Sequence, residues 1–186
     1  SDNIIEYNVE ENLQREDDFG LNEFKTYQEF AKRVEKSKND LIELLTKLKN
    51  DGKRIMSIGA TAKSTTVFNY CGIDDSLIEL ITDTTTAKQG MYSPGSHIPV
   101  VDRESVNIND YDYVYLGAWN FKNIIVNIER EFVQNGGKFI THVPNVSIGS
   151  AKWAPMANIN EFLVKHFEED DVAEGKVEKQ LLQEDK

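Results

Sequence analysis

The fold is indicated by residues 55–66, which read Ile55-Met56-Ser57-Ile58-Gly59-Ala60-Thr61-Ala62-Lys63-Ser64-Thr65-Thr66. The first four residues form a short apolar run, and small and hydroxyl-bearing residues follow it directly. Apolar side chains then return at helical spacing, as Val67, Phe68 and Tyr70. This order predicts a buried strand, a tight turn and a helix, which is the unit from which α/β proteins are built.

The flanking segments repeat this alternation of helix and strand. The pattern predicts a long amphipathic helix over residues 24–49, ended by Gly52, and a shorter helix over residues 124–133. Further strands are predicted at residues 77–82, 113–116 and 138–143, with a short one at residues 98–100, where a loop rich in Gly, Pro and Ser ends. Short apolar strands between helices predict an α/β fold, a Rossmann-like doubly wound parallel sheet with helices on both faces.

The two ends of the chain differ from its centre in charge. The formal net charge is −11, yet seven acidic residues and a single arginine fall within residues 1–20, and the centre is close to neutral. We therefore expect an acidic N-terminal segment over residues 1–20, the Rossmann-like domain over residues 21–150, and an amphipathic helix with a charged tail over residues 151–186. The apolar stripe of that helix consists of Ile159, Phe162, Leu163, His166 and Phe167.

Composition argues against several classes of protein. An acidic chain lacks the clustered Lys and Arg of a nucleic-acid-binding protein. No apolar run approaches the roughly 20 residues that a membrane span needs, and the first residues do not resemble a signal peptide. We therefore expect a cytoplasmic protein with no membrane partner. The sequence leaves open whether the chain forms a homo-oligomer. Because Cys71 is the only cysteine and no histidines are paired, we expect neither a disulfide within this chain nor a metal site.

The turn that begins at Gly59 is the first candidate ligand site. Ligands of open parallel sheets bind beyond the carboxyl ends of the strands, where helix N-termini point outward and favour phosphate. Thr61 and Ser64 occupy positions that are glycine in the dinucleotide-binding fingerprint, so the turn departs from that motif. It fits a phosphate site or a plain strand-to-helix turn. The candidate contacts are Gly59, Ala60, Thr61, Ala62, Lys63 and Ser64.

Two later loops are expected at the same edge of the sheet. Asp83 follows the second predicted strand, where dinucleotide-binding folds often place an acid on a ribose hydroxyl; a turn or helix-capping role is the alternative. The loop that begins at Lys88 is joined there by Trp119 and Asn120, which suit stacking and hydrogen bonding to a base or sugar, although Trp is also common in cores.

The histidines are the usual acid-base candidates, and there are three. We expect His97, in the Gly- and Pro-rich loop, to contact a ligand at this edge, with a solvent-facing role as the alternative. His142 ends a strand and fits either role, and His166 lies on the apolar stripe of the tail as a packing residue. Cys71 ends a helix and is expected to be buried and inert.

Several of these segments together resemble a known family. The segments, in order, are Ile58-Gly59-Ala60-Thr61-Ala62-Lys63, Asn69-Tyr70-Cys71-Gly72-Ile73, Asp83 with Ala87-Lys88-Gln89-Gly90, Pro94-Gly95-Ser96-His97-Ile98-Pro99-Val100, and Trp119-Asn120. In order and spacing, from about Phe24 to Val146, they resemble the C-terminal domain of S-adenosylmethionine-dependent sugar C-methyltransferases. The resemblance adds Asn69 and Gln89 to the candidate substrate contacts.

The resemblance implies a division of labour between domains. Such enzymes have a zinc-binding module, a central domain that binds S-adenosylmethionine, and a C-terminal domain that helps to bind a nucleotide-linked keto-sugar, which is methylated next to its ketone. It implies that this chain positions the nucleotide diphosphate and depends on a methyltransferase domain in cis or in trans. S-adenosylmethionine is a cofactor of the full enzyme and is not expected to bind this chain, and the catalytic residues are unknown.

Two other functions stay open on the sequence. The chain could be a non-catalytic module for a nucleotide or phosphate ligand that recruits a partner protein through its acidic termini. A small NAD-dependent enzyme is disfavoured, because Thr61 replaces the second glycine of the fingerprint and no paired base is evident.

Overall fold

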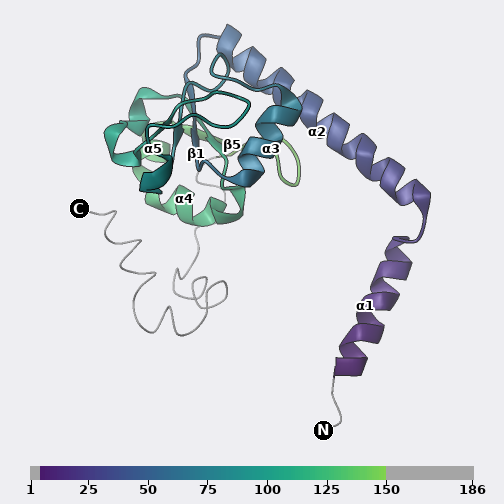
Figure 1. Cartoon of the computed structure of the whole chain (residues 1–186). Coiled ribbons are helices and arrows are strands. Elements are labelled where there is room, and N and C mark those ends of the chain that lie inside the picture. The colour runs from purple at the N-terminus through teal and green to yellow at the C-terminus, as the bar shows by residue number, and fades with distance from the viewer. Residues whose placement is uncertain (1–4, 150–186) are drawn as a thin grey trace.

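The computed structural model describes residues 5–149, with side chains described from Val9 onward. These residues form a layered α/β domain from which two helices project (Figure 1). The amphipathic helix predicted around residues 159–167, including His166, lies outside the described residues.

A six-stranded sheet forms the centre of the domain, with strand order β3-β2-β1-β4-β5-β6. The strands are β1 (Ile55–Ile58), β2 (Ile81–Thr82), β3 (Val100–Val101), β4 (Tyr113–Leu116), β5 (Lys138–Thr141) and β6 (Ser147–Gly149). All neighbouring pairs are parallel except β5 and β6, which are antiparallel. The predicted α/β fold with a parallel sheet is therefore confirmed, with an antiparallel strand at one edge.

Helices cover both faces of the sheet (Figure 1). On one face lie α2 (Phe24–Asn50) and α3 (Ala62–Cys71); on the other lie α4 (Lys122–Ile128) and α5 (Arg130–Gln134). A separate helix, α1 (Ile5–Phe19), precedes α2, and the four short 3-10 helices are η1 (Thr86–Lys88), η2 (Arg103–Ser105), η3 (Ile108–Asp110) and η4 (Trp119–Phe121). None of the helices between residues 5 and 149 combines the length and apolar character that crossing a bilayer requires.

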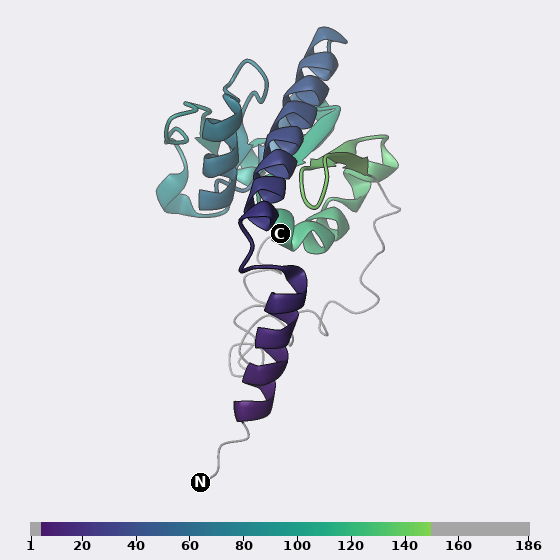
Figure 2. The same ribbon diagram turned by 90° about the vertical axis from the view of Figure 1, so that its right-hand side faces the viewer.

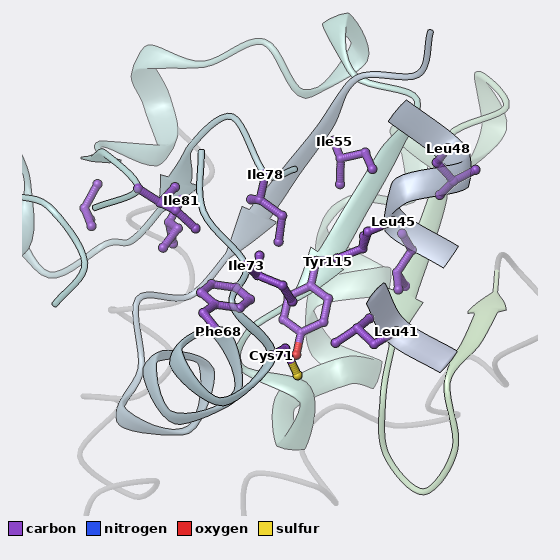
Figure 3. Close-up of a cluster of buried hydrophobic side chains, with 13 residues drawn as sticks. Leu41, Leu45, Leu48, Ile55, Phe68, Cys71, Ile73, Ile78, Ile81 and Tyr115 are labelled. Carbon is purple, nitrogen blue, oxygen red and sulfur yellow. The ribbon is translucent and has the colours of Figure 1, made fainter. Parts of the chain in front are cut away.

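Alternation along the strands divides the core into two clusters. Ile55 and Tyr115 face α2 and α3, whereas Met56 and Val114, next to them in the chain, face α4 and α5. Figure 3 shows the first cluster, in which the Tyr115 ring lies among Leu41, Leu45, Phe68 and Ile73. All of these side chains are almost fully buried, and burying each aliphatic one contributes about 1.5–3 kcal/mol. The apolar positions in the sequence thus correspond to the side chains buried on the two faces of the sheet.

Two strand predictions were too long. The strand predicted over residues 77–82 is regular only at β2, because the amide of Ile78 donates to the Asp74 carbonyl and holds the preceding residues in a turn. The strand predicted over residues 138–143 ends at Thr141, where the chain reverses into β6. The short strand expected at residues 98–100 starts later, at Val100.

The helix predicted over residues 124–133 is wrong as a single element, because it breaks at Glu129 into α4 and α5. Glu129 is buried, and its carboxylate accepts a hydrogen bond of 2.7 Å from Nε of Arg103. A buried charge requires such a partner, and the ion pair fixes Glu129 at the break. Neither strand β6 nor the helix α1 within the acidic segment was predicted from the sequence.

Candidate functional site

The strand order reverses between β1 and β4, and the candidate site lies at their carboxyl ends. After β1 the chain enters α3 on one face, and after β4 it enters η4 and α4 on the other. Such a reversal leaves a crevice between the two loops, which is where open α/β sheets bind ligands. The loop residues that meet at this point are Gly59 to Ser64 and Gly117 to Asn120.

Two glycines let these loops approach each other. Gly59 has a φ of +95°, and a Cβ added there would lie 2.8 Å from Cβ of Ala118. A Cβ added to Gly117 would lie 2.3 Å from the Gly59 carbonyl oxygen. Neither position accepts a side chain without displacement of the other loop, so the close approach explains the glycine at both.

The hydroxyl of Thr61 connects the two loops and starts α3. It donates to the Gly117 carbonyl at 3.0 Å and accepts from the Ser64 amide at 3.1 Å. The Ser64 hydroxyl in turn accepts from the Thr61 amide, which completes a capping box. The predicted residues Thr61 and Ser64 therefore act through the backbone of the site, and sequence reasoning missed Gly117 as their partner. A glycine directly after a predicted strand, as at Gly59, was the available signal.

The first turn of α3 presents donors to the crevice. Within the described part of the chain, the amides of Ala62 and Lys63 have no hydrogen-bond partner. Both amides belong to the positive end of the helix dipole, which favours an anion. The turn predicted from the sequence therefore presents two backbone amides at a helix N-terminus, and phosphate binding there stays a prediction.

Lys63 adds a cation to these donors and reaches across the crevice. Its Nζ lies 3.0 Å from Oδ1 of Asn120 and 5.5 Å from the centre of the Trp119 ring. Lys63 and Asn120 are exposed, and Trp119 is half-buried against the core cluster on the α4 side. The structure thus brings together three predicted contacts from two loops, and Trp119 takes part in both the core and the site.

Asp83 organises the neighbouring loop. Its carboxylate accepts from the amides of Ala60 and Thr85, each at 2.8 Å, and forms an ion pair of 3.1 Å with Lys88. Burial alone would raise the pKa of Asp83, but the hydrogen bonds from Thr85, Lys88 and Ala60 outweigh it and hold the pKa below its usual value. Gln89 closes the loop by donating to the Asp83 carbonyl at 3.0 Å. These contacts fit the turn-stabilising role that the sequence left open for Asp83.

The structure places Asn69 and His97 apart from this cluster. Asn69 donates to the Pro94 carbonyl at 2.8 Å, and a Cβ on Gly95 would overlap its side chain. Asn69 lies seven residues into α3, about 10 Å along the helix from Ala62. The hairpin that carries His97 therefore packs beside the later turns of α3. Strand β3 starts only after this hairpin, so the tip of the hairpin lies toward the amino end of the strands. This corrects the expectation that His97 lies at the ligand edge.

The surroundings of His142 and Cys71 belong to the core of the domain. Nδ1 of His142 lies 2.7 Å from Oη of Tyr115, and burial lowers the pKa of the imidazole. Cys71 is buried, as expected, and burial raises the pKa of its thiol. The described residues contain no group of three His, Cys, Asp or Glu side chains that could hold a metal ion. The described loops of the candidate site present the backbone amides of Ala62 and Lys63 and the ammonium of Lys63.

Comparison with known proteins assigns the domain to a family. A family model described as the C-methyltransferase C-terminal domain matches residues 2–144, which include every residue of the candidate site. The chain belongs to the C-methyltransferase C-terminal domain family. It is also 36% identical over 152 residues to the C-methyltransferase NovU of Streptomyces niveus. The match covers 82% of this chain but 36% of NovU, so the chain spans about a third of that C-methyltransferase.

Proposed function

We propose that this chain is the substrate-binding part of an S-adenosylmethionine-dependent C-methyltransferase that acts on a nucleotide-linked keto-sugar. In this role it holds the nucleotide diphosphate while the carbon next to the ketone is methylated. Membership of a C-methyltransferase family supports the reaction class. The strand order 3-2-1-4-5-6 is that of Rossmann folds and supports a Rossmann-like assignment.

The observation that carries the proposal is the cluster of donors across the crevice. The amides of Ala62 and Lys63 and the Lys63 ammonium converge at the start of α3, with Asn120 on the opposite loop. A diphosphate is an anion with several acceptor oxygens, and charge-assisted hydrogen bonds to it are about twice as strong as neutral ones. The half-buried Trp119 ring beside Lys63 offers an apolar surface to the rest of the ligand.

The chemistry of the reaction explains why a separate positioning domain is useful. A base removes the proton next to the ketone, and the resulting carbanion attacks the methyl group that S-adenosylmethionine supplies. A misplacement of about 1 Å can reduce the rate of such a step 100-fold. Binding energy from the remote diphosphate, gained at Lys63 and the start of α3, would fix the sugar relative to the methyl donor.

Titration calorimetry of the 186-residue chain tests this function. We expect deoxythymidine diphosphate to bind and S-adenosylmethionine not to bind, because the described loops form one anion site and it is assigned to the diphosphate. Deoxythymidine serves as the control for the diphosphate contribution and should bind more weakly. Binding of S-adenosylmethionine without binding of the diphosphate would reverse the assignment of the site.

A further inference from the structure

One side of α2 carries large apolar residues in both halves of the helix, but only its second half is covered. Leu41, Leu45 and Leu48 are buried in the core, with at most 6% of each exposed. Phe24, Tyr27 and Phe30 are 76%, 52% and 57% exposed. At about 100° per residue, all six side chains fall within an arc of about 120° around the helix. The side of α2 that packs on the sheet therefore continues into solvent, with Val34 and one charged residue, Lys38, on this side between Phe30 and Leu41.

Helix α1 adds further exposed apolar side chains to this region. We use the term projecting face for the exposed apolar side chains of the two helices, which are Val9, Leu13, Phe19, Phe24, Tyr27 and Phe30, each about half or more exposed. The joint between the helices is held by hydrogen bonds, including one of 2.7 Å from Oη of Tyr27 to the Leu21 carbonyl. Phe24, Tyr27 and Phe30 share one side of α2, and exposed apolar residues that lie together in this way typically mark an interaction site.

The projecting face lies on helices that extend away from the sheet. Helix α2 has 27 residues and β1 has four, which correspond to about 40 Å and about 13 Å. Figures 1 and 2 show that α1 and the first half of α2 lean away from the layered domain, whereas the second half of α2 lies against it. Contact with the rest of the domain begins where Oη of Tyr70 donates to Glu35 at 2.9 Å.

We propose that the projecting face docks the methyltransferase domain that carries the methyl donor, an inference that rests on the proposed function. The matched segment covers 36% of NovU, so most of that C-methyltransferase lies outside the part that this chain resembles. Six acidic residues against one arginine in α1 indicate that the docked surface carries Lys or Arg around an apolar centre.

Hydrogen exchange tests the docking independently of activity. We compare the complete 186-residue chain alone with the same chain joined to the part of NovU outside its matched segment. Amides of residues 9–34 should exchange at least tenfold more slowly in the joined protein, whereas those of β1 and β4 should not change. The double substitution Phe24→Ser with Phe30→Ser should abolish this slowing. Met91→Ser with Tyr92→Ser, at side chains that are 60% and 65% exposed on the hairpin that carries His97, should preserve it.

Each remaining outcome overturns the docking proposal. Equal exchange in the two proteins, or slowing that survives the Phe24 and Phe30 substitutions, removes the face as the docking surface. Sedimentation of the chain alone as a dimer that Phe24→Ser with Phe30→Ser converts to monomer assigns the face to a second copy instead. Calorimetry with deoxythymidine diphosphate on the same variant separates the docking proposal from the proposed function. Absence of diphosphate binding in every protein would contradict the diphosphate function and would leave the exchange result unaffected.

Discussion

Nζ of Lys63 lies 3.0 Å from Oδ1 of Asn120, although the two residues are 57 positions apart in the chain. One stands in the first turn after β1 and the other on the loop after β4, so their hydrogen bond spans the point where the strand order reverses. A diphosphate bound at the start of α3 would share the ammonium with Asn120. The cation is therefore already oriented toward the crevice before any ligand binds.

Removal of this cation should weaken diphosphate binding. We expect Lys63→Ala to cost about 1–3 kcal/mol in the free energy of binding deoxythymidine diphosphate, because a charge-assisted hydrogen bond is lost. Asn120→Ala removes a neutral partner and should cost about 0.5–1.5 kcal/mol. Calorimetry gives both values, and Lys32→Ala, at an exposed lysine on α2, is the matched control. Equal affinity of the Lys63 and Lys32 variants would contradict the site.

A side chain at Gly59 should destabilise the fold more than one at Gly136. Both glycines have a φ of +95°, but a Cβ at Gly136 meets nothing within 4 Å, whereas one at Gly59 meets Ala118. Backbone strain should therefore cost each alanine variant about 1–2 kcal/mol, and the overlap should add about 1–3 kcal/mol to Gly59→Ala alone. Urea denaturation measures the two free energies of unfolding. Equal losses would show that the loops after β1 and β4 are not in contact.

Acid should reduce the contribution of Asp83 to stability. Its pKa is lower in the folded chain than the usual value near 4, so its stabilisation is present above that value and is lost as the pH falls through the folded pKa. At pH 7 we expect Asp83→Asn to lower the free energy of unfolding by about 1–3 kcal/mol. The difference from wild type should shrink at pH 3, and urea denaturation at both pH values measures it.

Asp75→Asn is the control for the Asp83 variant, because Asp75 is exposed on a turn and accepts none of the hydrogen bonds described for the site. This variant should match wild type at both pH values. A loss in Asp83→Asn that stays constant between pH 7 and pH 3 would show that the ionised carboxylate is not what stabilises the loop.

The isolated chain should not transfer a methyl group. Enolate chemistry needs a base near the reacting carbon, yet His142 is engaged by Tyr115 and His97 lies on the hairpin beside α3. Incubation of the chain with S-adenosylmethionine and a nucleotide-linked 4-keto sugar should leave the mass of the sugar unchanged. Addition of one methyl group should appear when the part of NovU outside the matched segment is joined to the chain. Methylation by the chain alone would place the base among its own residues.

Local patterns in the sequence predicted the elements whose borders are set locally. The strand β4 agrees with its predicted range, and α2 differs from its prediction by one residue, because an apolar run and a Gly52 stop are both visible in the sequence. The break at Glu129 depends on Arg103, which is 26 positions away and invisible to a periodicity argument. Strand β6 exists only as a partner of β5, so its short and partly polar sequence gave little signal.

The candidate site also has parts that could be predicted from local sequence and parts that could not. The start of α3 was predictable, because a turn of small residues between a strand and a helix has few other conformations. Its pairing with Gly117 was not, since that contact depends on which strand lies beside β1. His97 was placed at the wrong edge because a loop of fourteen residues, Lys88 to Val101, leaves the direction of its hairpin open. Its role in binding stays a prediction, which His97→Ala tests in the same calorimetry.

Helix α2 also sets the angle between its exposed apolar side chains and its core-facing leucines. Insertion of one residue between Val34 and Leu41 would rotate Phe24 and Phe30 by about 100° relative to the core-facing leucines. Insertion of seven residues would restore the direction to within about 20° but move the face about 10 Å away from the sheet. Because one end of α2 is packed in the core, the length of the helix fixes both the distance and the direction of the projecting face relative to the sheet. Insertions and deletions in this segment should therefore be far less acceptable than substitutions.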